Sequence, residues 1–299
     1  MITVPIAYPE QFSFAECLVF LGRSDRECLH FVKDGCLHRM LVQDGAPLLL
    51  TVREAAGKQA LEVMVTNPWQ VPVNEAGVQQ FLTHWLHLDA DLRHFYSFAA
   101  KDAVLAPLVQ HYPGLRLIGI PDLFESITWT ITGQQISLPF AYTLRRRFVE
   151  AFGYHAQING TDYYTYPHPA VVAGLRPEDL LPMQFSRSKA HYIIGIATAM
   201  AEGRLSAAQL RQMEYSAARE YLLQWKGIGN WSANYVLMKY SRFPEALPLE
   251  DAGLHNALRR QLQLPAKPSL AAVKDYTAHW RQHAAYATFY LWRSLTAGA

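Results

Sequence analysis

The hydrophobic pattern changes its period once along the chain, and this change decides the fold class. Between His30 and about Thr66, apolar and polar residues alternate, and the segment turns at Asp-Gly pairs such as Asp34-Gly35. Alternation interrupted by Asp-Gly predicts an antiparallel sheet. From Pro121 onward, apolar residues recur every three or four positions, which predicts helices. We therefore expect an α+β N-terminal domain followed by an all-α region.

Seven helices are expected in the second part of the chain, where prolines mark the connections. They cover residues 123–134, 138–152, 189–201, 217–224, 232–240, 254–262 and 284–295. Strand signals are nearly absent there. In the first part, one helix is expected around residues 78–86 and another through Tyr96. We therefore divide the chain into an α+β domain at residues 1–112 and a helical region at 113–299.

The composition excludes a membrane-spanning protein. About half of the 299 residues are apolar (51%), yet no apolar run reaches the roughly 18 residues that a membrane helix needs. The N-terminus also lacks the features of a secretory signal. The three cysteines, Cys17, Cys28 and Cys36, are an odd number without Cys-x-x-Cys spacing, which fits a reducing compartment. We expect a cytoplasmic protein; its net charge of +2 is too small to identify a nucleic-acid partner.

Two Cys-Leu-His tripeptides offer four potential metal ligands. These are Cys28, His30, Cys36 and His38. Residues i and i+2 of a strand share a face, so such side chains could bind zinc. However, a turn at Asp34-Gly35 places one cysteine beside the turn and the other well down the partner strand. We favour two ordinary strands over a zinc site.

A Gly-Ile-Gly turn between two predicted helices is the most informative local motif. Gly227 and Gly229 can adopt positive φ and let the backbone approach a ligand, and the helix that follows begins with unpaired N–H groups. Such a helix start suits a phosphate, and Lys226 adds a cation. By itself the motif is weak, because a plain interhelical turn would use the same residues, including the apolar Ile228 between the glycines.

Several motifs occur in the order typical of one family. They are PGLRL (113–117), DLFE (122–125), GQQIS (133–137), GIGNWSANY (227–235) and ED (250–251). The glycine turn resembles the helix-hairpin-helix of the DNA glycosylase superfamily, and the whole order resembles the bacterial 3-methyladenine DNA glycosylase II family. The resemblance implies a hairpin motif at about residues 216–241. It also implies two helical subdomains with the base pocket between them.

Asp251 corresponds to the catalytic carboxylate of that family. Glycosidic cleavage normally uses two carboxyl groups, one of them an acid for the leaving group. An N-alkylated purine is already cationic and leaves without that proton, so one ionised Asp could suffice by stabilising positive charge on the sugar. The simpler interpretation is an N-cap for the helix that begins near Leu254, and both roles could coexist. Glu250 is the neighbouring residue with which Asp251 could be confused.

Trp231 stands where superfamily members that also cut the strand carry a lysine that forms a Schiff base. The resemblance therefore implies a monofunctional glycosylase without lyase activity. No cysteine follows Cys36, which excludes the iron–sulfur cluster of one family branch. We expect no cofactor and no metal, except for a monovalent cation that the hairpin could bind.

Three aromatic residues are implied as walls of the base pocket: Trp231, Tyr235 and Trp292. The first two are four residues apart and share a helix face. Aromatic rings attract a cationic base through stacking and cation–π energy, of order 1–3 kcal/mol per ring. Without the resemblance, aromatic residues at this spacing would be ascribed to the core.

A base inside a duplex must be extruded, and a wedge side chain fills the gap. The resemblance places the wedge at Gln135, where relatives carry an apolar residue, so this glutamine departs from the family pattern. The alternative is an ordinary polar loop residue. We expect Arg187, Lys189 and Lys226 to contact phosphates. The run at residues 145–147, three successive arginines, is expected mainly on a solvated face.

These observations predict a base excision repair enzyme that hydrolyses the N-glycosidic bond of alkylated bases such as 3-methyladenine and 7-methylguanine in double-stranded DNA. We expect a monomer. One alternative is a non-catalytic helix-hairpin-helix DNA-binding protein, and another is a glycosylase for oxidised or deaminated bases. A mere DNA clamp needs neither Asp251 nor the aromatic set, whereas only substrate data distinguish the two kinds of glycosylase.

Overall fold

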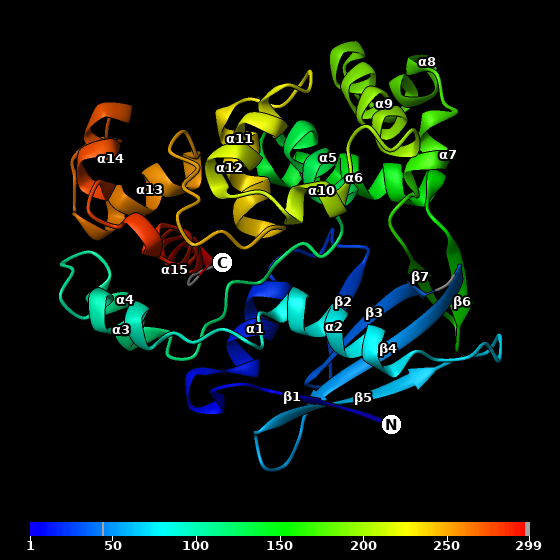
Figure 1. Ribbon diagram of the computed structural model, residues 1–299, viewed down its shortest axis with the longest axis horizontal. Coiled ribbons are helices and arrows are strands. Elements are labelled where there is room, and N and C mark those ends of the chain that lie inside the picture. Colours follow the sequence, from blue (N-terminus) through cyan, green and yellow to red (C-terminus); the bar gives the residue numbers. More distant parts are fainter. Residues whose placement is uncertain (44, 297–299) are drawn as a thin grey trace.

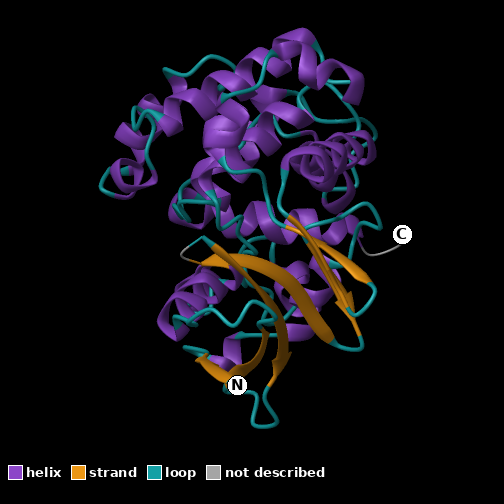
Figure 2. Cartoon of the chain, turned by 90° about the vertical axis from the view of Figure 1, so that its right-hand side faces the viewer, coloured by secondary structure: helices purple, strands orange, loops and turns teal. Residues whose placement is uncertain are grey.

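The computed structural model describes residues 1–43 and 45–296. Its sheet and its larger helical part lie side by side, with the sheet at one end of the molecule (Figures 1 and 2). None of the described helices is both long and apolar enough to cross a membrane. The predicted fold class, an antiparallel α+β domain followed by helices, is therefore confirmed.

A five-stranded antiparallel sheet forms the first part, in the order β1-β5-β4-β3-β2. Its strands are β1 (Ile2–Pro5), β2 (His30–Lys33), β3 (Cys36–Gln43), β4 (Ala46–Glu54) and β5 (Ala60–Thr66). The turn predicted at Asp34-Gly35 is present, because Lys33 pairs with Cys36 and both turn residues have positive φ (52° and 71°). The expected Asp-Gly turn at residues 44–45 includes residue 44, which lies outside the described part of the chain. Strand β1 was not predicted, because it is short and, unlike the equally short β2, has no Asp-Gly turn beside it that marks a hairpin.

Four α-helices and one 3-10 turn accompany the sheet. They are η1 (Pro9–Gln11), α1 (Phe14–Leu21), α2 (Glu75–Leu86), α3 (Arg93–Ala99) and α4 (Ala106–His111). Helix α2 buries Val78, Leu82 and Trp85, which are spaced by three or four residues and therefore share one face. The two helices expected in this part correspond to α2 and α3.

The second part contains all seven predicted helices, with boundaries within a few residues of those expected, and additional short ones. The α-helices are α5 (Leu123–Gly133), α6 (Leu138–Phe152), α7 (Pro169–Ala173), α8 (Pro177–Leu180), α9 (Arg187–Ala201), α10 (Ala207–Arg211), α11 (Tyr215–Leu223), α12 (Asn230–Lys239), α13 (Ala252–Gln261), α14 (Leu270–Thr277) and α15 (Ala284–Thr296). The 3-10 turns are η2 (Leu181–Met183) and η3 (Arg281–His283).

A small hairpin corrects the expectation that strands are nearly absent from the second part. Strands β6 (His155–Ile158) and β7 (Thr161–Tyr164) pair antiparallel and extend toward the sheet (Figure 1). The ring of Tyr163 packs on Phe31 of β2, with centroids 5.5 Å apart. Each strand is short and mostly exposed, so the hydrophobic pattern gives no period.

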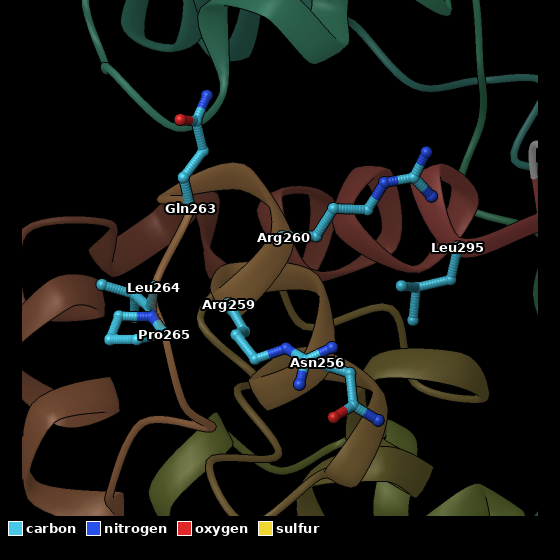
Figure 3. A pocket seen from close by; sticks show the side chains of 7 residues that line it. All are labelled: Asn256, Arg259, Arg260, Gln263, Leu264, Pro265 and Leu295. Atoms are coloured by element: carbon cyan, nitrogen blue, oxygen red, sulfur yellow. The ribbon is translucent and has the colours of Figure 1, made fainter.

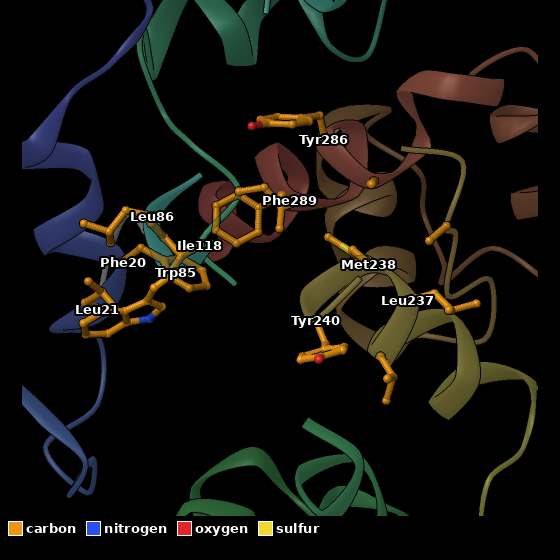
Figure 4. Packing of buried hydrophobic residues seen from close by; sticks show 14 of the residues in the cluster. Phe20, Leu21, Trp85, Leu86, Ile118, Leu237, Met238, Tyr240, Tyr286 and Phe289 are labelled. Carbon is orange, nitrogen blue, oxygen red and sulfur yellow. The ribbon is translucent and has the colours of Figure 1, made fainter. Parts of the chain in front are cut away.

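One hydrophobic core runs through both parts of the chain. In Figure 4, Phe20 of α1 and Trp85 of α2 face Phe289 of α15, while Met238 of α12 approaches from the other side. Helix α5 is buried along nearly its whole length. The core therefore fixes the positions of α12, α13 and α15 relative to the sheet. Helices α12 and α15 carry Trp231, Tyr235 and Trp292, and Asp251 directly precedes α13.

Candidate active site and DNA-binding surface

Asp251 is the N-cap of α13, and its carboxylate accepts three hydrogen bonds. Oδ2 accepts from the backbone N–H of Leu254 at 2.7 Å and from Trp292 Nε1 at 2.8 Å, while Oδ1 accepts from Trp231 Nε1 at 3.0 Å. No cation forms a salt bridge with this carboxylate among the described residues. The three donors are neutral groups, so they orient the carboxylate without bringing a positive charge to it. Both roles expected for Asp251, helix cap and available carboxylate, are thus compatible in one geometry.

Gly253 leaves the room that the carboxylate occupies. A Cβ atom at this position would lie 2.8 Å from Asp251 Oδ2 and 3.1 Å from Trp292 Nε1. Real Cβ atoms essentially never come within 3.0 Å of a neighbour, so a side chain here would displace Asp251 or Trp292. Gly253 was not predicted as part of the site. The available signal was a glycine in the first turn of a helix, two residues after Asp251.

The three predicted pocket aromatics meet around this carboxylate. The ring of Tyr235 lies between those of Trp231 and Trp292, with centroid distances of 5.5 and 5.7 Å. The Tyr235 hydroxyl accepts a hydrogen bond from Trp129 Nε1 of α5 at 3.0 Å. Burial raises the pKa of Tyr235, so its hydroxyl stays protonated at neutral pH. Trp129 was not predicted, because it lies about a hundred residues before Tyr235 and follows no motif that points to it.

The predicted hairpin connects α11 to α12 and presents backbone at the surface. Gly227 has φ of 91°, and a Cβ there would lie 2.6 Å from the ring of Tyr192. Ile228 is buried and anchors the turn, whereas Lys226 and Gly229 are exposed. Gly229 is the N-cap of α12 and has no side chain to satisfy the first N–H groups. These groups are therefore available to an anion.

The loop that carries Gln135 is joined to this hairpin. Gln134 Nε2 donates to the carbonyl oxygen of Gly227 at 2.8 Å and to Ser232 Oγ at 3.3 Å. Gln135 itself is exposed and has φ of 57°, a left-handed conformation. The loop therefore holds the predicted wedge residue out from the surface beside the hairpin. A monovalent cation at the hairpin stays a prediction, and the Gly227 carbonyl is already used by Gln134.

Lys189 has a different task from the phosphate contact that we expected. Its Nζ donates to the carbonyl oxygens of Thr132 and Gln134, at 2.8 and 2.7 Å, and so caps the end of α5. Burial lowers the pKa of this ammonium group. Arg187 is exposed at the start of the same helix α9, where its nearest carboxylate is Glu178 at 3.5 Å. Arg187 and Lys226 remain available for phosphates.

The three successive arginines of α6 do not form the solvated face that we expected. Arg145 is buried and bonds to Glu27, which precedes β2, and to Glu125 of α5 at 3.7 Å. Arg146 contacts the carbonyl oxygen of Glu27, and Arg147 bonds to the end of η2. The run therefore ties α6 to neighbouring segments, and a local charge pattern cannot show such distant partners.

The Cys-Leu-His repeat belongs to two ordinary strands, as favoured from the sequence. His30 pairs with Arg39, whereas His38 pairs with Phe31, so the two imidazoles lie on opposite faces of the sheet. Within the described part of the chain, no group of three or more His, Cys, Asp or Glu side chains could hold a metal ion. The described geometry therefore does not bring the four potential ligands together in one site.

An open groove of about 690 Å³ lies between the end of α13 and α15 (Figure 3). Arg259 and Arg260 line it, and Arg260 donates to the carbonyl oxygen of Ser294. The groove is at the C-terminal end of α13, whereas Asp251 caps the N-terminal end. None of the predicted site residues lines the groove, so it is not part of the candidate site.

Comparison with known proteins decides which family this geometry belongs to. A family model described as "HhH-GPD superfamily base excision DNA repair protein" matches residues 128–282, and a second, the AlkA N-terminal domain, matches residues 3–122. The chain belongs to the HhH-GPD superfamily of base excision DNA repair proteins. This membership confirms the family resemblance predicted from the motifs. The matched residues 128–282 include the hairpin, Asp251 and most of the helical region.

Named relatives match this chain over lengths that range from 60% to nearly all of it. The DNA-3-methyladenine glycosylase of Bacillus subtilis is 36% identical over 98% of this chain and 97% of the relative. DNA-3-methyladenine glycosylase 2 of Escherichia coli is 27% identical over 60% of each chain. The solved 3-methyladenine DNA-glycosylase from Archaeoglobus fulgidus has the same fold, with a TM-score of 0.81, 23% identity and coverage of 99% and 97%.

Gly253→Ala is expected to separate stability from activity. Alanine at a helical position stabilises a protein by about 0.5–1 kcal/mol relative to glycine, so the free energy of unfolding should not fall by more than about 1 kcal/mol. Displacement of the Asp251 carboxylate should lower the rate of base release by about 10- to 100-fold. Urea unfolding and a base-release assay measure the two effects.

The matched control for this variant is Gly195→Ala in α9, where an added Cβ meets no atom within 4 Å. We expect this control to keep full activity. Full activity of Gly253→Ala would contradict the role assigned to the space beside Asp251.

Proposed function

We propose that this protein hydrolyses the N-glycosidic bond of alkylated bases, such as 3-methyladenine and 7-methylguanine, in duplex DNA. The observation that carries the proposal is the Asp251 carboxylate, which two indole N–H groups and a backbone N–H orient and which pairs with no Lys, Arg or His side chain of the described residues. The names of the Bacillus and Escherichia relatives, both 3-methyladenine glycosylases, support this substrate class.

The proposed reaction assigns a task to each part of the site. The bond between the sugar C1′ and the base nitrogen breaks, and its electron pair leaves with the cationic base, which becomes neutral. Positive charge then develops on the sugar, where the Asp251 carboxylate stabilises it. A water molecule adds its oxygen to C1′ and loses a proton, which gives an abasic site. The rings of Trp231, Tyr235 and Trp292 would bind the flipped cationic base.

The DNA would be bound on the surface formed by the hairpin, the start of α9 and the loop around Gln135. The N–H groups at the start of α12, together with Lys226 and Arg187, would contact phosphates. Gln135 would enter the space left by the flipped base. As a polar side chain it can also form hydrogen bonds with the unpaired base of the opposite strand.

We also propose that the enzyme lacks lyase activity and works as a monomer in the cytoplasm. Trp231 occupies the position at which a lysine amine would be needed for a Schiff base, which supports simple hydrolysis. Trp231, Trp292 and the Leu254 backbone orient Asp251 within a single chain, so this arrangement needs no second subunit. Cys17, Cys28 and Cys36 are all free thiols, which supports a reducing compartment.

Methylated duplex DNA provides the test of this function. We expect the protein to release free methylated purines, detected by chromatography, and to leave the strand uncut. Borohydride should trap no covalent adduct between protein and DNA, because water and not an amine attacks the sugar. If no base is released, the proposed function is wrong, and a strong borohydride adduct would contradict the monofunctional mechanism alone.

A further inference from the structure

A cavity of about 40 Å³ lies between the helical part and the first part of the chain, and Tyr235 is the one of the three proposed pocket aromatics that lines it. Trp129 and Tyr142 line it from α5 and α6, and Arg23 lines it from the loop after α1. One water occupies about 30 Å³ of liquid, so this space cannot hold a whole purine, but it can hold one substituent of a base.

The cavity begins where the aromatic walls of the proposed base pocket end. Tyr235 packs its ring on Trp231 and Trp292, whose indoles bond to Asp251, and its hydroxyl reaches Trp129 at the cavity wall. Burial raises the pKa of the Tyr235 hydroxyl, Arg23 lowers it and Asp251 raises it. The hydroxyl therefore lies within reach of the fields of both Arg23 and the catalytic carboxylate.

Arg23 and His30 at the cavity carry polar groups without a hydrogen-bond partner among the described residues, and most of these free N–H groups belong to Arg23. The Arg23 guanidinium lies 3.8 Å from the centroid of the Phe20 ring, and among the described residues it donates only from Nη1, to the Phe20 carbonyl oxygen. Arg23 is an exposed residue at the edge of the cavity, and its Nε and Nη2 make no hydrogen bond to the described residues, so they can donate to a ligand. His30 is buried at the same cavity, and neither of its ring nitrogens has a hydrogen-bond partner within the described residues.

The two carboxylates at this cavity are already engaged. Glu125 accepts from Arg39 at 2.9 Å, and Glu27 bonds to Arg145. What remains for a ligand is a set of donors around Arg23. A wall of this kind favours a group that accepts hydrogen bonds, such as a carbonyl oxygen, and disfavours an amino group, which would leave donors facing donors.

We propose that Arg23 is a specificity-determining residue that binds a carbonyl oxygen on the inner edge of the flipped base. This inference rests on the proposed glycosylase function. With the glycosidic nitrogen at Asp251, the C6 edge of a purine lies opposite, toward the cavity. A 7-methylguanine carries a carbonyl group at C6, whereas 3-methyladenine carries an amino group. Both bases are cationic, so a difference in their release rates does not come from a difference in charge. The site selects 6-oxopurines relative to 6-aminopurines.

The test compares both bases in one sample of duplex DNA treated with dimethyl sulfate, which contains both lesions. Release of 7-methylguanine and of 3-methyladenine is measured by chromatography under single-turnover conditions for the wild type and for Arg23→Met. We expect the variant to release 7-methylguanine about tenfold more slowly and 3-methyladenine within about twofold of the wild-type rate. Arg23→Lys keeps the charge but loses the planar fork, so its ratio should lie between the two.

Arg53→Met is the matched control, because Arg53 is exposed on β4 and pairs only with Glu62 there. It should leave both rates and their ratio unchanged, and thermal unfolding verifies that each variant is folded. An unchanged ratio in Arg23→Met, or an equal fall of both rates, overturns the inference while the proposed function stands. If the wild type releases neither base, the proposed function itself fails.

Discussion

Asp251→Asn is expected to abolish base release and to leave the fold intact. Asparagine caps a helix about as well as aspartate, so the free energy of unfolding should change by less than about 1 kcal/mol. The amide carries no charge to stabilise the sugar cation, and its NH₂ group would face an indole N–H at Trp231 or Trp292. Loss of such electrostatic stabilisation should reduce the rate by about 10³-fold. Single-turnover release of methylated purines and urea unfolding measure the two quantities.

Glu250→Gln is the control for this variant, because Glu250 is the adjacent carboxylate, is exposed and is the residue that sequence alone could confuse with Asp251. It should retain full activity. If instead Asp251→Asn remains active and mainly loses stability, the capping interpretation is sufficient and the catalytic assignment is wrong.

Arg145→Met is expected to cause the largest loss of stability. Arg145 is buried between Glu27 and Glu125, and Glu125 also pairs with Arg39, so four alternating charges connect β3, α5, α6 and the segment before β2. Removal of one partner from a buried ion pair leaves an uncompensated charge, which costs about 3–5 kcal/mol. Urea unfolding measures this loss. Arg53→Met, which breaks an exposed pair with Glu62, should cost about 0–1 kcal/mol.

The loss in Arg145→Met should also depend on pH. Burial, the largest single influence, raises the pKa of the Glu27 carboxyl, but Arg145 lowers it, and with the smaller contributions of His30, Arg39 and the backbone N–H of Leu29 the net pKa lies well below the ordinary value. In the wild type this pair therefore stabilises the fold above the unfolded pKa of Glu27, and the contribution is lost only as the pH falls through the depressed folded pKa. Without Arg145, burial dominates and protonation relieves the carboxylate. The destabilisation should therefore be smaller at pH 4 than at pH 7, and an equal loss at both would contradict the role of this carboxylate.

The sequence predicted those parts of the fold that depend on local periodicity. The longer helices and strands have enough turns or alternating positions to show a period, and the Asp-Gly turn indicated the short strand β2. Strand β1 and the hairpin β6–β7 are four residues each and take their stability from pairing and packing, not from their own pattern. The prediction that the three successive arginines form a solvated face was wrong for a related reason, because Glu27, the partner of Arg145, lies 118 residues earlier in the chain.

In the candidate site, too, some residues could be predicted from the sequence and others could not. Trp231 and Tyr235 lie one turn apart on α12, and the family motifs pointed to Asp251 and Trp292, so the sequence could bring these four together. Their support comes from elsewhere. Trp129, Arg23 and the space beside Gly253 enter the site only through tertiary packing, and no spacing along the chain indicates that they do.

The bonds of Lys189 to the end of α5 have a consequence for how such a protein would search a genome. Because the Lys189 ammonium group is bonded within the protein, it does not contact a DNA phosphate. Each lysine–phosphate contact strengthens binding to DNA of any sequence, damaged or not, so the affinity for undamaged DNA is lower without this one. Time spent on undamaged DNA is therefore shortened. The same two bonds restrain the loop that carries Gln135. The protein would therefore bind undamaged duplex weakly while it keeps the residue that enters the duplex in a fixed position.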